Sequence, residues 1–230
     1  MKRLRALLPL LLLIALGAIV FASGALAPLH PERLVQEEAH WRTGIRAHPW
    51  WAAAAHIAAM ALAVATGVPG AVLVVLAGGM LFGALLGALL STTGTVIGAT
   101  LLFLASRRAF DRGIGREPAL AARLRASYHA HPISYALFLR LVPLFPFGAT
   151  SIALAWLRCP LWLFLASSVC GGAVMIAFES ALGAGLVETL AHGGDVSASL
   201  LAHPRILGPL LGMAALALLP VLLGRLRRNR

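Results

Sequence analysis

The chain has 230 residues, of which 60% are hydrophobic and only 12% are charged, and its mean hydropathy is +0.89. This balance excludes an ordinary soluble domain, because a water-soluble fold cannot bury so much apolar surface. The formal net charge of +11 comes mainly from arginines that lie beside apolar segments, at both termini and in one central stretch. That distribution is typical of the positive-inside rule and argues against nucleic-acid binding.

Several apolar stretches reach the roughly 20 residues that are needed to cross a hydrocarbon core of about 30 Å. These runs are continuous rather than alternating, which predicts helices and not a barrel. We therefore expect an all-α polytopic membrane protein. The two cysteines, Cys159 and Cys170, form no redox motif, and the only close pair of histidines is His129 and His131. We expect no metal site and no cofactor.

Residues 1–49 are interpreted as an N-terminal transmembrane helix and an external loop. A basic start is followed by an apolar run that ends near Ala27, so a cleaved signal peptide is the alternative. The retained helix is favoured, because the run exceeds a secretory core and Pro28 would be a poor residue after a cleavage site. Arginines before the helix and mixed charge after it predict a cytoplasmic N-terminus.

The predicted core of the fold covers residues 50–190. It begins with a helix over residues 50–66, opened by the interfacial pair Trp50 and Trp51. His56 lies inside this apolar helix. A neutral histidine that is hydrogen-bonded to a neighbouring helix is favoured there over a proton relay.

Residues 67–107 are glycine-rich, too long for one crossing and barely long enough for two. Close helix packing through small residues and a helix that turns back at Gly78-Gly79 are both consistent with the pattern, and both can hold at once. We expect a re-entrant hairpin followed by a closely packed helix. The residues concerned are Pro69, Gly78, Gly79, Gly83 and Gly87. The number of crossings between residues 50 and 106 stays open. An external loop before residue 50 and cytoplasmic arginines after residue 106 require an odd number, whereas one helix, one hairpin and one further helix give an even number. Either residues 69–106 contain two true crossings or the charge rule fails locally.

Residues 107–134 form the only extended polar stretch. After Pro118, the residues Leu120, Leu124 and Tyr128 recur every four positions, which indicates an amphipathic helix. We interpret it as a helix on the cytoplasmic interface, with a solvated linker as the alternative.

The segment FLRLVPLFPF, residues 138–147, combines a guanidinium with two helix-breaking prolines in apolar surroundings. A charge at membrane depth must face protein or a wet cavity, and Pro143 and Pro146 free backbone carbonyls upstream. We therefore expect a second hairpin over residues 135–157 that opens a polar crevice at Arg140. Glu179 is the one acid in the apolar run of residues 160–182 and is the predicted partner of Arg140.

This pairing has two interpretations, a fixed ion pair or a charge that titrates and releases Arg140 to a substrate. Arginine fits phosphate with two parallel hydrogen bonds, so an anionic headgroup is the expected ligand. Residues 191–230 are predicted to form a polar loop, a last transmembrane helix and a basic tail that faces the cytoplasm.

The motif AGGMLFG at residues 77–83, followed by RLVPLFPF at residues 140–147, resembles the SNARE-associated, or VTT-domain, membrane proteins and their DedA relatives. The resemblance covers roughly residues 50–190. It implies two re-entrant hairpins that face each other in an inverted repeat, and a role in moving lipids across the bilayer. The hairpin arginine of the family corresponds to Arg140, and its prolines correspond to Pro143 and Pro146.

Two departures from the family pattern stand out. DedA proteins carry an acid just after the first hairpin proline, where this chain has Gly70, Ala71 and Val72; this weighs against proton-coupled transport by that route. Many relatives also place an asparagine and a glycine near the positions of Ser151 and Ala155. The hairpin is expected to be kept, with a thinner polar lining.

The favoured function is a lipid translocase or scramblase for anionic headgroups of phospholipids or polyprenyl phosphate. One alternative is a proton- or ion-coupled transporter of a small solute, which would need more intramembrane acids than Glu179 alone. A membrane scaffold without transport is another. No nucleophile-base pair is visible, so an enzyme is not expected. The expected partners are membrane lipids, and a homo-oligomer stays open. The excess of Arg over Lys suggests a GC-rich bacterium and hence its inner membrane.

Overall fold

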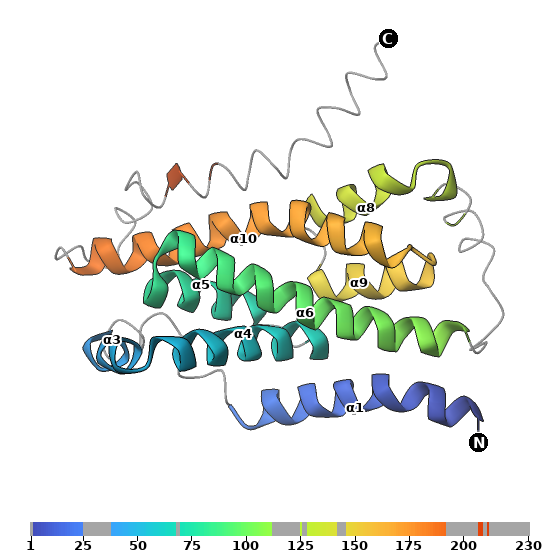
Figure 1. Ribbon diagram of the computed structural model, residues 1–230, viewed down its shortest axis with the longest axis horizontal. Coiled ribbons are helices and arrows are strands. Elements are labelled where there is room, and N and C mark those ends of the chain that lie inside the picture. Colours follow the sequence, from blue (N-terminus) through green and yellow to red (C-terminus); the bar gives the residue numbers. More distant parts are fainter. Residues whose placement is uncertain are drawn as a thin grey trace, which may run out of the picture.

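The computed structural model describes residues 2–24, 38–67, 70–111, 125, 128–141, 146–191, 207–208 and 211. These residues form eight helices and contain no strand (Figure 1). The helices are α1 (Lys2–Ala22), α3 (Glu38–Ala47), α4 (Pro49–Thr66), α5 (Ala71–Phe82), α6 (Ala84–Asp111), α8 (Pro132–Leu141), α9 (Phe147–Trp156) and α10 (Leu161–Ala191). The long helices lie roughly side by side in Figure 1.

Three stretches of helix are long and apolar enough to cross a membrane, namely Pro49–Thr66, Ala84–Asp111 and Leu161–Val187. The chain is therefore a multi-pass membrane protein built from helices. The apolar stretch of α1, Leu7–Val20, is shorter than these candidate spans. Three further apolar helices are also short: α5 has 12 residues, and α8 and α9 have 10 each. At a rise of 1.5 Å per residue they extend about 15–18 Å, well below the roughly 30 Å of a hydrocarbon core.

Helices α4 and α6 run in the same direction, although the helix between them is short. His56 on α4 is hydrogen-bonded to Ser91 on α6, and further along both helices Gly98 lies against the backbone of Ala61. Figure 1 shows the same parallel arrangement. The chain must therefore return between the two helices, through α5 and its flanking residues.

The prediction of a turn at Gly78-Gly79 is wrong. Helix α5 continues through both glycines, and the break comes at Gly83, which has φ 82° and ψ 169°. Only glycine adopts this backbone region readily, because a Cβ would collide with the neighbouring peptide. Adjacent glycines lower helix propensity, but the packing of α5 on its neighbours holds the helix there.

The glycines of α5 and α6 have different roles. A Cβ on Gly79 would collide with the carbonyl group of Ser180 on α10, and one on Gly87 would meet the backbone of Gly78 at 2.5–2.6 Å. These two positions therefore allow backbones to approach closely. Gly83 has open space around it, so the close packing that was expected at this position is not seen. Glycine is required there because of its positive φ. Pro69 lies outside the described residues.

The core that positions the second broken segment is built from α6, α8, α9 and α10. The rings of Phe103 on α6 and Phe164 on α10 are stacked with centroids 4.2 Å apart, and both are fully buried. Leu154 on α9 and Ala136 on α8 belong to the same buried cluster. The short helices α8 and α9 are thus packed on long helices, although neither is long enough to span a membrane alone.

Candidate functional site

Arg140 is the buried charge of the second broken segment. It lies in the last turn of α8, and only 3% of its surface is exposed. Its Nη1 donates to the carbonyl oxygen of Phe147 at 3.2 Å and to Oγ1 of Thr150 at 2.9 Å. Its Nη2 donates to Oγ of Ser151 at 3.1 Å. The first part of α9 therefore supplies all three acceptors, and none of them carries a charge.

Two aromatic rings complete the surroundings of this guanidinium. Its Cζ lies 3.8 Å from the ring centroid of Phe147 and 4.9 Å from that of Phe164. Both distances are in the range of cation-π attraction. A Cβ on Gly171 would lie 2.6 Å from Cβ of Arg140, so a glycine in α10 provides the room for α8. Helices α8, α9 and α10 together enclose the charge.

The expected partnership of Arg140 with Glu179 is not formed. Within the part of the chain that the structure describes, no ion pair joins Arg140 to Glu179, whereas Arg158 is paired with Asp111. Arg140 meets α10 at Gly171, and Glu179 follows eight residues later, which is about 12 Å further along the helix. The pair does not form because Arg140 contacts α10 at Gly171, and a side chain about two helical turns further along α10 lies out of its reach. The guanidinium is therefore buried without a described carboxylate.

A break in the helix is present at Pro146. Helix α8 ends at Leu141, and Pro146 is the residue before α9, with φ −54° and ψ 138°. Its carbonyl accepts from the backbone N–H of Thr150, which closes the first turn. Pro143 lies outside the described residues. The break directs α9 past Arg140, so that its hydroxyls reach the guanidinium.

Sequence reasoning missed Thr150 altogether and noted Ser151 only as a departure from the family pattern. Both hydroxyls also donate to the carbonyl oxygen of Phe147, at 2.9 and 2.8 Å. Two adjacent hydroxyl residues one turn after the second proline were the available signal. Nε of Arg140 is buried and has no hydrogen-bond partner among the described residues. The site thus keeps donor capacity for a ligand.

His56 forms a second buried polar contact at a distance from Arg140 along α6. Its Nε2 is 2.8 Å from Oγ of Ser91, and its ring lies 5.5 Å from that of Phe82. The ring occupies the space over Gly78. This geometry matches the favoured interpretation, a histidine that is hydrogen-bonded to a neighbouring helix. In the described part of the chain, no cluster of three His, Cys, Asp or Glu residues could hold a metal ion.

The hydroxyl pair allows a first prediction. The double variant Thr150→Val with Ser151→Ala is expected to lose roughly 3 kcal/mol or more of stability, because hydrogen bonds to a charged group contribute about 1.5–3 kcal/mol each. Thermal unfolding in detergent measures this. Ser168→Ala is the matched control, since its buried hydroxyl donates only to the carbonyl of Phe164 in its own helix. Equal losses in the two variants would show that the hydroxyls do not hold the guanidinium.

A comparison with known families identifies one that covers both broken segments. The model of the VTT domain matches residues 68–185, which is just over half of the chain and includes both broken segments. No curated protein and no solved structure gives a significant match. The chain belongs to the VTT-domain family of SNARE-associated and DedA membrane proteins.

Proposed function

We propose that this protein moves lipids with anionic headgroups across the bilayer, and that Arg140 holds the headgroup. The observation that carries the proposal is a guanidinium that is 3% exposed and has no carboxylate partner among the described residues. A buried charge without a counter-charge is expensive, and an incoming anion would lower that cost. Membership in the VTT-domain family supports a membrane function of this kind.

A lipid phosphate suits this site for a geometric reason. The guanidinium offers planar pairs of N–H donors that match two phosphate oxygens, and its present acceptors are neutral oxygens that a phosphate can replace. An anionic ligand would therefore form stronger hydrogen bonds than Thr150 and Ser151 do. The headgroup can bind there while its apolar chains stay in the lipid.

The short helices support the re-entrant arrangement that this function needs. Helices α5, α8 and α9 extend only about half the thickness of a hydrocarbon core. We place α5 with the start of α6, and α8 with α9, as two hairpins that enter the membrane and turn back at Gly83 and before Pro146. Irregular backbone at depth is tolerated where it lies against protein, and the packing on α10 provides that.

The orientation in the membrane follows from charge. Arg107, Arg108, Arg125 and Arg158 occur around the end of α6 and the turn before α10. We infer that this end faces the cytoplasm of a bacterial inner membrane, together with both termini. An ion-coupled solute transporter is the second candidate, because Glu179 is an acid inside α10 that forms no ion pair with a described residue.

Reconstitution tests the proposal. Liposomes would contain a fluorescent phosphatidylglycerol or polyprenyl phosphate in both leaflets, and an impermeant quencher would be added outside. In protein-free liposomes the quencher reaches only the label in the outer leaflet. With the protein present, nearly all of the label is expected to be quenched. Fluorescent phosphatidylcholine is the neutral control and should move more slowly. Quenching of every label at the level of protein-free liposomes would contradict lipid translocation and favour the solute transporter.

A further inference from the structure

The turn between α9 and α10 is closed by two backbone hydrogen bonds. The N–H of Arg158 donates to the carbonyl of Ala155 at 3.1 Å, and the N–H of Cys159 donates to that of Leu154 at 3.0 Å. This is the Schellman arrangement that often ends a helix, with Cys159 and Leu154 as the buried apolar contact. Arg158 occupies the left-handed position, at φ 58°, where glycine is usual.

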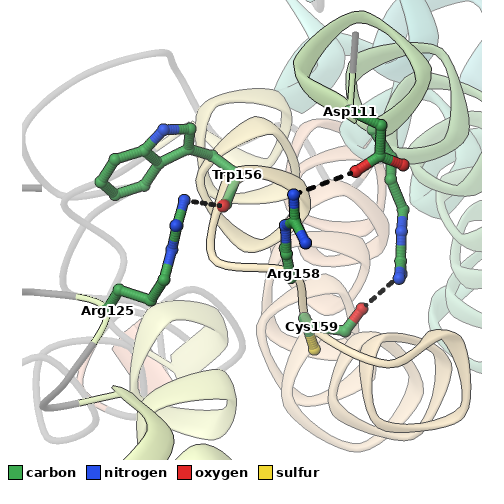
Figure 2. Close-up of polar contacts among 6 residues, drawn as sticks. Asp111, Arg125, Trp156, Arg158 and Cys159 are labelled. Atoms are coloured by element: carbon green, nitrogen blue, oxygen red, sulfur yellow. Dashed lines mark hydrogen bonds and ion pairs between the residues drawn. The ribbon is translucent and has the colours of Figure 1, made fainter. Parts of the chain in front are cut away.

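Two other arginines hold the carbonyls on either side of Arg158 (Figure 2). Nη2 of Arg125 donates to the carbonyl of Trp156 at 3.3 Å, and Nη1 of Arg107 donates to that of Cys159 at 2.9 Å. These bonds satisfy carbonyls that the end of α9 and the following Pro160 leave without backbone donors. Arg107 and Arg125 therefore have a clear structural role, and their positive charges are fixed beside the turn.

Arg158 has no comparable structural role. Its side chain is 62% exposed, and Nη2 lies 3.8 Å from Oδ1 of Asp111, whose side chain is 52% exposed. An ion pair this long and this exposed to solvent contributes little. The turn itself would form more easily with glycine at this position. Arg158 thus places a largely available guanidinium at a surface that already carries two more.

The surroundings of the turn fit a lipid headgroup. Asp111 ends the long apolar helix α6 and Leu161 begins α10, so the turn lies at the level where the candidate membrane spans end. Trp162, which is 64% exposed, lies in the first turn of α10, four residues after Arg158, and tryptophan favours the boundary between headgroups and acyl chains. Burial raises the pKa of the Cys159 thiol, so no thiolate competes for the arginines at neutral pH.

We propose that Arg107, Arg125 and Arg158, here named the arginine turn, form a surface site for the phosphodiester of an anionic membrane lipid. Arg158 makes the direct contact, the two fixed arginines contribute charge, and Trp162 lies beside the acyl chains. Among the described residues at this turn there are three arginines and one carboxylate, Asp111, and this balance favours an anion. Arg140 is buried, with 3% of its surface exposed, and is not part of this surface site. Its use in loading lipids for translocation rests on the proposed function, whereas lipid binding itself does not.

A binding titration tests this site without any transport. The purified protein in neutral detergent is titrated with dioctanoyl phosphatidylglycerol, and dioctanoyl phosphatidylcholine and inorganic phosphate serve as the other two probes. Phosphatidylglycerol is expected to bind at least about tenfold more tightly than either, because it alone combines the anionic phosphodiester with acyl chains. Equal binding of phosphatidylcholine, or of inorganic phosphate, would overturn the assignment to an anionic lipid.

Arg158→Gly separates binding from folding. This variant is expected to unfold at the same or a higher temperature, because glycine adopts the left-handed conformation without strain. Its affinity for phosphatidylglycerol should fall about tenfold, as expected for the loss of a charge-assisted contact. Arg46→Gln, which removes an exposed arginine from α3, is the control for net charge and should bind normally.

Asp111→Asn gives the opposite expectation. Removal of the competing carboxylate should strengthen binding of phosphatidylglycerol, by about threefold for a solvent-exposed charge. Wild-type affinity in Arg158→Gly would overturn the proposal, and so would weaker binding in Asp111→Asn. If the protein binds phosphatidylglycerol in this way but moves no lipid, the lipid site at the arginine turn is supported and the proposed translocation is contradicted. The failure of one proposal can therefore be told from the failure of the other.

Discussion

Arg140→Lys is expected to lower the rate of headgroup translocation by at least about tenfold while the protein stays folded. Lysine keeps the positive charge, but its ammonium is a point donor and cannot bind two phosphate oxygens in one plane. The loss of one such contact corresponds to about 1.4 kcal/mol or more in the transition state. The quencher assay in liposomes measures the rate, and thermal unfolding in detergent measures the stability.

Arg140→Met extends this prediction to a variant without charge. A methionine in this apolar enclosure should be tolerated, because replacement of a buried ion by an apolar side chain is often neutral or stabilising. Translocation should be lost, however, since no cation remains to hold the headgroup. Arg46→Lys on the exposed face of α3 is the control for both variants. A wild-type rate in Arg140→Lys would show that only charge is needed at this position.

The partner of Arg140 can be tested in the same experiment. An ion pair with Glu179 would predict that Arg140→Met combined with Glu179→Gln recovers the stability and activity that the first change removes. The structure has hydroxyls of α9 around Arg140, and Glu179 lies about two helical turns along α10 from the contact at Gly171. We therefore expect the two changes to be additive, as for residues that do not touch. Recovery in the double variant would establish the ion pair instead.

The features that depend on local sequence could be predicted. Composition and the length of apolar runs indicated a helical multi-pass membrane protein, and Pro146 indicated a break before α9. A proline acts on its own turn of helix, so its effect does not depend on the rest of the fold. The family was also predicted correctly, because the two quoted motifs lie inside the matched region, residues 68–185.

The features that depend on tertiary contacts could not be predicted. Gly78 and Gly79 looked like a turn, but packing against His56 and Ser180 keeps them helical, and the break falls at Gly83. Glycine permits both outcomes, so its neighbours in space decide between them. Likewise, the terminal nitrogens of Arg140 donate to the hydroxyls of Thr150 and Ser151, while its Nε has no partner among the described residues. A search for an opposite charge does not detect hydroxyls, although several of them together can satisfy a guanidinium.

The largest effect on folding is expected from Gly79→Ala, which should prevent recovery of monodisperse protein or destabilise it by about 3 kcal/mol. Its methyl group would collide with the backbone carbonyl of Ser180, and a backbone on a long packed helix cannot give way as a side-chain end can. Gly183→Ala should behave similarly, because it would collide with the carbonyl of Leu76 across the same pair of helices.

Gly44→Ala, in α3 with open space around it, should be neutral or slightly stabilising. Yield and melting temperature measure all three variants. Normal yield and melting of Gly79→Ala would mean that α5 and α10 are not in backbone contact, and the packing that supports the short helix would have to come from elsewhere.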